Sequence, residues 1–265
     1  MSDPITIAIE TLLRDVATRI VMPRFRALAA DDIIEKSPGE LVTIADRESE
    51  LRLAEGLSGI LSEAQIIGEE ASESDPSMLE SVDNGLVWLI DPIDGTSNFT
   101  EGKSPFALMI ALLNNGVREG GWIYDPVANR FCHAMRGKGA FVDHIAVTAR
   151  ETGGVLPLAA LATGFMTPEK RADVAARAAG KLSIVPIPRC AGEQYPRLIL
   201  GQNDVALFER TLPWDHAAGT LFVEEAGGVI RRNDGSGYLI GDGGTGLLGA
   251  ASQRLWDDAA RILFG

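Results

Sequence analysis

Residues 88–99 read Trp88-Leu89-Ile90-Asp91-Pro92-Ile93-Asp94-Gly95-Thr96-Ser97-Asn98-Phe99. An apolar run from Leu86 to Ile90 leads into two carboxylates three residues apart, and small polar residues follow. The run has the length of a buried strand, and Pro92 cannot donate to a ladder, so we expect the strand to stop there. The carboxylates can hold hard cations and the turn can hold a phosphate, whereas an Asx-type turn that caps the next segment is the competing interpretation.

The composition is that of an ordinary globular protein. The 265 residues are 46% hydrophobic and 23% charged, which is enough for one large domain or two lobes. No apolar stretch approaches the roughly 20 residues of a membrane helix, and Met1 to Pro4 do not resemble a secretory signal. The two cysteines, Cys132 and Cys190, form no disulfide framework, so we expect a cytoplasmic protein.

The chain is strongly acidic, with a net charge of −13 and a pI of about 4.7. Such a surface repels nucleic acid and anionic lipid, so we expect neither nucleic acid nor membrane as a partner. It also repels a phosphate ester. A phosphate substrate would therefore require bound divalent metal to reverse the sign of the charge inside the site.

Hydrophobic periodicity predicts an α+β fold in two closely packed lobes, residues 1–148 and 149–265. In the first lobe we expect helices over residues 5–29 and 43–63, a break at Pro38-Gly39, and an exposed loop of low order over 71–84. An antiparallel meander is expected at 106–113, 117–124, 131–134 and 139–142. In the second lobe strands and helices alternate, as in α/β proteins, over residues 158–163, 168–179, 182–186, 192–200, 205–208, 214–226, 228–231, 246–251 and 252–264.

Three acidic groups share one context, because each lies beside an apolar strand-like piece or a turn. They are Glu69-Glu70, Asp91 with Asp94, and Asp215 in Leu212-Pro213-Trp214-Asp215. Asp215 could instead cap a helix, and Asp46 could be a first-turn acid of the helix over 43–63. Four or more carboxylates without a Cys/His cluster favour Mg²⁺ or Mn²⁺ over zinc.

These motifs resemble the inositol monophosphatase family, which belongs to a superfamily of metal-dependent phosphomonoesterases with fructose-1,6-bisphosphatase. Its three signatures are matched by residues 88–99, by Gly68-Glu69-Glu70 and by Trp214-Asp215-x-Ala217-Ala218-Gly219. Lys36-Ser37-x-x-x-Leu41-Val42-Thr43-x-x-Asp46 and Glu224-Glu225-Ala226-Gly227-Gly228 match further elements in the family's order. The resemblance implies a layered α/β/α/β/α sandwich.

The resemblance also implies roles for individual residues. Glu69, Asp91 and the Ile93 carbonyl would bind a first metal, Asp91, Asp94 and Asp215 a second, and a third, weaker ion would lie near Glu69. Asp46, Thr96 and Glu69 would be catalytic, with Thr96 and Asp46 orienting and helping to deprotonate a water. The implied substrate-binding set is Ile93, Asp94, Gly95, Thr96, Glu209 and Asp215.

Other residues near these motifs receive more ordinary interpretations. We expect Glu70 to lie behind the ligands or at the surface, His216 to pack locally at a helix start, and Cys190 to be a small buried residue. Lys36 could add positive charge near the third ion or simply be exposed. His133 and His144 show no metal spacing.

The released alcohol is less well determined than the chemistry. The family usually has Gly-Ser/Thr-Ala-Ala where this chain has Cys190-Ala191-Gly192-Glu193, and the chain is one residue short between Glu209 and Asp215. An inositol phosphate is the first expectation, and relatives act on histidinol phosphate, fructose 1,6-bisphosphate or adenosine 3′,5′-bisphosphate. The family also implies lithium sensitivity and a homodimer.

Two hypotheses compete with a Mg²⁺-dependent phosphomonoesterase. One is a phosphatase that forms an aspartyl-phosphate, as haloacid dehalogenases do at Asp-x-Asp-Gly-Thr, but here the two acids are three residues apart rather than two. The other is a metal-binding protein that has kept the fold and acts through a partner.

Overall fold

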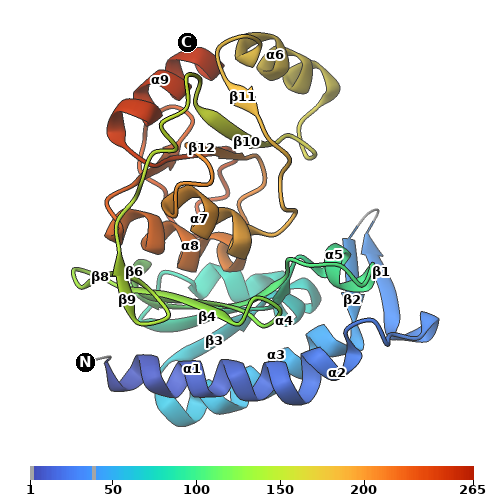
Figure 1. The fold of residues 1–265 in the computed structure, drawn as a ribbon. Helices are drawn as coiled ribbons and strands as arrows, with labels where there is room; N and C mark the ends of the chain where they lie inside the picture. Colours follow the sequence, from blue (N-terminus) through green and yellow to red (C-terminus); the bar gives the residue numbers. More distant parts are fainter. Residues whose placement is uncertain (1–2, 38–39) are drawn as a thin grey trace.

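The fold is a stack of five layers, seen edge-on in Figure 1. The computed structural model describes residues 3–37 and 40–265. From one side to the other, the layers are a helical pair, a seven-stranded sheet, a second helical pair, a five-stranded sheet and a third helical pair. The helical pairs are α1 (Pro4–Val16) with α3 (Ile44–Ile60), α7 (Ala191–Ile199) with α8 (Pro213–Glu225), and α6 (Pro168–Ala178) with α9 (Gln253–Phe264). The expected α/β/α/β/α sandwich is confirmed.

The first predicted helix is shorter than residues 5–29. It widens at its end into a π-turn, η1 (Ala17–Val21), and continues only through α2 (Met22–Arg24). Pro23 lies just after this π-turn and has no amide to donate to the preceding turn of the helix. The prediction was wrong for residues 25–29 because the pattern of apolar residues does not reveal this interruption.

A hairpin that the sequence analysis missed connects this region to α3. Strands β1 (Ile33–Ser37) and β2 (Glu40–Thr43) pair antiparallel. The predicted break at Pro38-Gly39 lies outside the described residues. The second predicted helix is confirmed with shorter bounds, since α3 begins at Ile44 and ends at Ile60.

The seven-stranded sheet contains the predicted meander. Its strands, in spatial order, are β3 (Gln65–Gly68), β4 (Leu86–Asp94), β5 (Ala107–Asn114), β6 (Val117–Asp125), β7 (Arg130–Met135), β8 (Gly139–Val142) and β9 (Ile145–Val147). All neighbours pair antiparallel except β3 and β4, which are parallel. The loop of low order expected at 71–84 is wrong in part, because α4 (Glu69–Ser74) and the 3-10 helix η3 (Pro76–Ser81) occupy much of it.

The five-stranded sheet has the order β11-β10-β12-β14-β13. Its strands are β10 (Leu158–Ala162), β11 (Ser183–Ile184), β12 (Val205–Phe208), β13 (Val229–Arg232) and β14 (Leu247–Ala250). The first three are mutually parallel and the last two run antiparallel to their neighbours. Parallel strands put their carboxyl ends at one edge, so the loops after β10, β11 and β12 gather there.

Among the described residues, buried apolar side chains form three cores, one around the central helical layer and one on the outer face of each sheet. The central core joins both sheets through α7 and α8, with Tyr195 and Phe222 among its members. The other two lie under α1 and α3 and between the second sheet and α9. The predicted division at residues 148 and 149 stays a prediction. Among the described residues no helix is long and apolar enough to cross a membrane.

Candidate active site

One cavity collects nearly all the residues that the sequence analysis singled out. Its volume is about 750 Å³. The predicted residues that line it come from both halves of the chain: Glu69, Asp91, Ile93, Asp94, Gly95, Thr96, Glu209 and Asp215. We call the side formed by Glu69, Asp91, Asp94 and Asp215 the carboxylate wall, and the side formed by Phe165, Ile187, Glu209 and Arg210 the alcohol wall. Asp46 is buried behind Thr96.

A β-bulge brings Asp91 and Asp94 to the same side of the sheet. Three residues apart, they would point to opposite faces of a regular strand. On β5, however, Asp91 pairs with Met109 and Asp94 with Ala107, so β4 carries one extra residue at this point. The bulge also accommodates Pro92 within the strand. The expectation that the strand stops at Pro92 is therefore wrong, and the strand continues to Asp94.

Gly95 turns the chain from β4 into the short helix α5 (Thr96–Thr100). Its φ is +86°, in the left-handed region where glycine carries no steric penalty. The carbonyl of Gly95 accepts from the amides of Asn98 and Phe99. The turn thus caps α5 and at the same time places Gly95 and Thr96 on the cavity surface.

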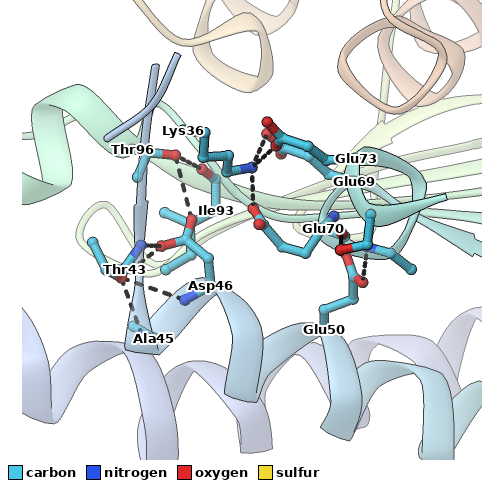
Figure 2. Close-up of polar contacts among 12 residues, drawn as sticks. Lys36, Thr43, Ala45, Asp46, Glu50, Glu69, Glu70, Glu73, Ile93 and Thr96 are labelled. Atoms are coloured by element: carbon cyan, nitrogen blue, oxygen red, sulfur yellow. Dashed lines mark hydrogen bonds and ion pairs between the residues drawn. The ribbon is translucent and has the colours of Figure 1, made fainter. Parts of the chain in front are cut away.

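The two carboxylate oxygens of Asp46 have different partners, one at the start of α3 and the other beside the cavity (Figure 2). Oδ2 accepts from the Thr43 amide at 2.8 Å and from its hydroxyl, which closes the capping box of α3. Oδ1 lies 3.3 Å from the Thr96 hydroxyl, which also reaches the Ile93 carbonyl at 2.9 Å. Burial raises the pKa of Asp46 to about 7. The capping and catalytic interpretations of Asp46 are therefore compatible.

Glu50 fixes the start of the helix that carries Glu69. Its two oxygens accept from the amides of Glu70 and Ala71, each at 2.8 Å (Figure 2), which anchors the N-terminus of α4. Gly68 makes room for it, because a Cβ at that position would lie 2.2 Å from the Glu50 carboxyl carbon. The sequence analysis missed Glu50, although its spacing from Asp46, one helical turn along α3, was a usable signal.

Lys36 supplies a cation at the edge of the carboxylate wall. Its Nζ lies 2.7 Å from Glu70, 2.7 Å from Glu73 and 3.5 Å from Glu69 (Figure 2). Burial lowers the pKa of Lys36, but the three carboxylates raise it more, so the ammonium form is favoured. Lys36 is thus half-buried among acids rather than exposed, and Glu70 is held behind the cavity by it.

Asp94 is held by a segment from the other half of the chain. Its Oδ2 accepts from the Gly192 amide at 2.6 Å and from the Cys190 thiol at 3.0 Å. Cys190 is buried as expected, but its contact with Asp94 was not foreseen. Glu193 bonds to Arg130 and, at 2.6 Å, to Arg197, neither of which lines the cavity. This chain has Cys190-Ala191-Gly192-Glu193 where the family usually has Gly-Ser/Thr-Ala-Ala. As a result the cavity contains the Cys190 thiol, and Glu193 joins α7 to β7 through Arg130 instead of lining the cavity.

Asp215 enters from the first turn of α8, after Pro213 at the helix start. The next residue, His216, is buried and bridges two segments: Nδ1 lies 2.6 Å from the Tyr195 hydroxyl and Nε2 lies 3.0 Å from the Arg210 carbonyl. Burial lowers the pKa of His216 to about 4. A neutral ring that donates to Arg210 and accepts from Tyr195 satisfies both contacts, which confirms local packing.

The carboxylate wall concentrates negative charge that the protein alone does not balance. Burial raises the pKa of all four acids, and nearby carboxylates add to the effect at Glu69, Asp91 and Asp215. At Asp94 burial outweighs the hydrogen bonds from Cys190 and Gly192, which favour the charged form. Carboxyl groups that raise one another's pKa values in this way indicate a site where a bound cation would be strongly favoured.

The donor set fits a hard divalent cation. Asp91 Oδ1 is buried and has no hydrogen-bond partner, although buried oxygens nearly always have one. All of the side-chain donors are oxygens, which suits Mg²⁺ or Mn²⁺. Within residues 3–37 and 40–265 no three Asp, Glu, His or Cys side chains already enclose one ion position. The fit therefore rests on the unpaired oxygen and the donor chemistry.

The alcohol wall is built from loops at the carboxyl edge of the parallel strands. Both oxygens of Glu209 are held by Lys170 Nζ, at 2.6 and 2.8 Å. The guanidinium of Arg210 lies 4.2 Å from the ring centre of Phe165. Neither Lys170 nor Phe165 was singled out by the sequence analysis, because no local motif marks either of them.

His133 and His144 lie far along the meander, within an aromatic group. The His133 ring stacks on Phe141 at 5.0 Å between centroids, and His144 lies 3.1 Å from Glu10. Burial lowers the pKa of His133 to about 4. Neither histidine lines the cavity, in agreement with the absence of metal spacing.

This chain is similar to known proteins in both its sequence and its fold. Residues 1–262 match the model of the family described as the inositol monophosphatase family. An inositol-1-monophosphatase of Bacillus subtilis is 28% identical over 91% of this chain and 89% of its own length. The protein named Nus factor SuhB of Escherichia coli K12 is 31% identical over 90% of this chain and 88% of its own length. The crystal structure of extragenic suppressor protein suhB from Bartonella henselae covers 99% of both chains with a TM-score of 0.84 at 21% identity, and thus shares the fold.

Proposed function

Because the chain belongs to the inositol monophosphatase family, we propose that it hydrolyses a phosphate monoester with the help of Mg²⁺. One observation carries the proposal. Four buried or half-buried carboxylates from both halves of the chain, Glu69, Asp91, Asp94 and Asp215, line one cavity with raised pKa values. Burying these carboxylates together costs free energy when no cation is bound, whereas a bound cation would compensate their charge and could bind a phosphate.

Two or three Mg²⁺ ions, or Mn²⁺, would be held by the carboxylate wall. The Ile93 carbonyl, Glu69 and Asp91 would bind one ion, Asp91, Asp94 and Asp215 a second, and a third would lie near Glu69. Bound ions of this kind lower the pKa of a water and neutralise a leaving oxygen.

The chain's own residues would orient the reactants. The Thr96 hydroxyl would hold the attacking water, and Asp46 Oδ1, at 3.3 Å from that hydroxyl, would accept the proton through it. With a pKa of about 7, Asp46 can take up a proton at neutral pH. The amides of Gly95 and Thr96 would bind the phosphate, and Lys36 would add positive charge near the third ion.

The proposal is tested with metal-stripped protein and a panel of phosphate esters. Inositol 1-phosphate comes first, because one relative is named an inositol-1-monophosphatase. Histidinol phosphate, fructose 1,6-bisphosphate and adenosine 3′,5′-bisphosphate complete the panel. We expect hydrolysis with added Mg²⁺, inhibition by Li⁺, and no phosphorylated Asp91. Full activity without metal, or a trapped aspartyl-phosphate, would contradict the mechanism.

A second candidate function is a role through a partner, favoured by the relatives named Nus factor SuhB. In that case the fold and its metal site would serve assembly rather than, or in addition to, hydrolysis. Failure to hydrolyse any ester of the panel with Mg²⁺, together with a stable complex in a pull-down, would favour this function.

We further infer a cytoplasmic homodimer that binds neither nucleic acid nor membrane on its own. The net charge of −13 supports the absence of nucleic-acid and membrane contacts, and the two buried free cysteines support the cytoplasmic location. The dimer is proposed from the family resemblance alone. Sedimentation velocity tests the dimer, and a binding assay with RNA and anionic vesicles tests the expected absence of both contacts.

A further inference from the structure

The alcohol wall offers little to a ring covered with hydroxyl groups. Its acid, Glu209, has both oxygens within 2.8 Å of the Lys170 ammonium, and only 11% of its side chain is exposed. The Lys170 amide in turn donates to the Thr167 hydroxyl that caps α6, which fixes the start of this helix. The carboxylate is therefore charge-compensated before any substrate arrives.

The same wall presents an exposed flat surface. Phe165 follows β10 and is 62% exposed, an unusual state for a large aromatic residue at the mouth of a cavity. The Arg210 guanidinium lies 4.2 Å from its ring centre, in cation–π contact, so the two planar groups form one platform. Ile187, which follows β11 and is also exposed, adds apolar surface to the same cavity.

Parallel strand topology explains why these residues meet. β10, β11 and β12 are parallel, and the loops that leave their carboxyl ends carry Phe165, Ile187 and Arg210. Ligands of α/β sheets commonly bind at this edge. The platform therefore lies where the part of the substrate remote from the phosphate would extend.

We propose, on the basis of the function proposed above, that the alcohol released by this protein carries a flat apolar ring, which stacks on the Phe165–Arg210 platform. Phe165 is then a specificity-determining residue. A saturated polyol of similar size lacks a π face for this platform and meets a carboxylate already held by Lys170.

Two esters of unactivated aliphatic alcohols test the proposal: 2-phenylethyl phosphate, which has the ring, and glycerol 2-phosphate, which does not. With Mg²⁺, we expect kcat/KM for the ring ester to exceed that for the polyol ester at least tenfold. Phe165→Ala should lower this ratio about fivefold to tenfold, mainly through KM of the ring ester. Phe165→Leu, apolar but not flat, should recover only part of the loss.

Ile184→Ala is the matched control, because Ile184 is similarly exposed, at 56%, but does not line the cavity. It should leave the ratio unchanged. A preference for glycerol 2-phosphate, or an equal effect of Phe165→Ala on both esters, would overturn the inference while leaving the phosphatase function intact.

Calorimetric binding of 3-phenylpropylphosphonate, a non-hydrolysable analogue of the ring ester, separates the two proposals. Without hydrolysis of any ester, binding that Phe165→Ala weakens about fivefold or more would support the platform and refute the phosphatase function. Absence of binding, or binding that the variant leaves unaltered, would overturn the platform.

Discussion

The two walls of the cavity are built in different ways. The carboxylate wall stands at the ends of regular elements: Asp91 and Asp94 on β4, Glu69 at the start of α4 and Asp215 in the first turn of α8. The alcohol wall consists of loop residues after β10, β11 and β12. Under the proposed function, rigid elements hold the groups that would need fixed spacing, and loops hold the groups that would contact the alcohol. The reaction and the substrate preference could then vary independently.

The most damaging change removes charge from the carboxylate wall. Asp91→Asn or Asp215→Asn should lower kcat with Mg²⁺ by about 10²-fold or more, because each substitution weakens the site that would hold the metal. Steady-state kinetics at saturating Mg²⁺ measures the loss. Asp173→Asn, at an exposed acid of α6 paired with Arg177, is the control and should retain full activity. Full activity in the Asp91 variant would remove the basis for placing the reaction at this wall.

The next change separates the two roles of Asp46. Asp46→Asn keeps an oxygen for the Thr43 amide but cannot accept a proton from the Thr96 hydroxyl, so kcat should fall about tenfold to hundredfold with little change in Tm. Steady-state kinetics and thermal melting of the same preparation measure kcat and Tm, and so separate the two roles of Asp46. A loss of stability without a loss of kcat would show that Asp46 only caps α3.

The charge of the wall should also appear in the pH dependence of stability. A carboxyl group with a pKa raised in the folded state stabilises the fold below its unfolded pKa, near 3.8, and this contribution is lost as the pH rises through about 7, as at Asp215 of the wall. In EDTA, the free energy of unfolding of the parent should therefore include a decrease of about 2 kcal/mol between pH 5 and pH 8.

Urea denaturation of parent and variants in EDTA measures this decrease. Asp91→Asn removes one buried charge and should reduce it, whereas Asp173→Asn should follow the parent. Mg²⁺ should restore the stability of the parent at pH 8. Identical pH profiles for the parent and Asp91→Asn would mean that the wall stores no uncompensated charge.

The smallest expected effect concerns the support of the wall. Gly68→Ala would bring a Cβ to within 2.2 Å of the Glu50 carboxyl carbon and displace the group that anchors α4, so we expect a loss of about 1–2 kcal/mol of stability. Gly59→Ala, in α3, adds its Cβ to open space and should instead stabilise the protein by roughly 0.5–1 kcal/mol. Equal effects of the two substitutions on urea midpoints would contradict the role given to Glu50.

The carboxylate wall was largely predictable from sequence because its residues lie in short local motifs. Even so, the bulge that turns Asp91 and Asp94 to one side was missed, since alternation of apolar residues does not reveal an inserted residue. The expected end of the strand at Pro92 was wrong for the same reason.

The contacts that join distant segments could not be predicted. The Cys190 thiol meets Asp94 from 96 residues away, and Lys170 meets Glu209 across 39 residues. Pairings of this kind depend on the tertiary packing of the layers and leave no periodic trace in the chain. The β1–β2 hairpin is different, because a Pro-Gly pair between two short runs is by itself a turn signal in a sequence, and the sequence analysis predicts only a break there.

The central helical layer has a consequence for biosynthesis. The seven-stranded sheet is complete at Val147, yet one of its faces packs against α7 and α8, which come later in the chain, and Asp215 lies in α8. A nascent chain that has emerged only to the end of the sheet therefore exposes an apolar face and lacks one acid of the carboxylate wall. We therefore expect full divalent-cation affinity only in a chain whose synthesis and folding are complete. Chaperones would recognise a truncated product by its uncovered apolar face.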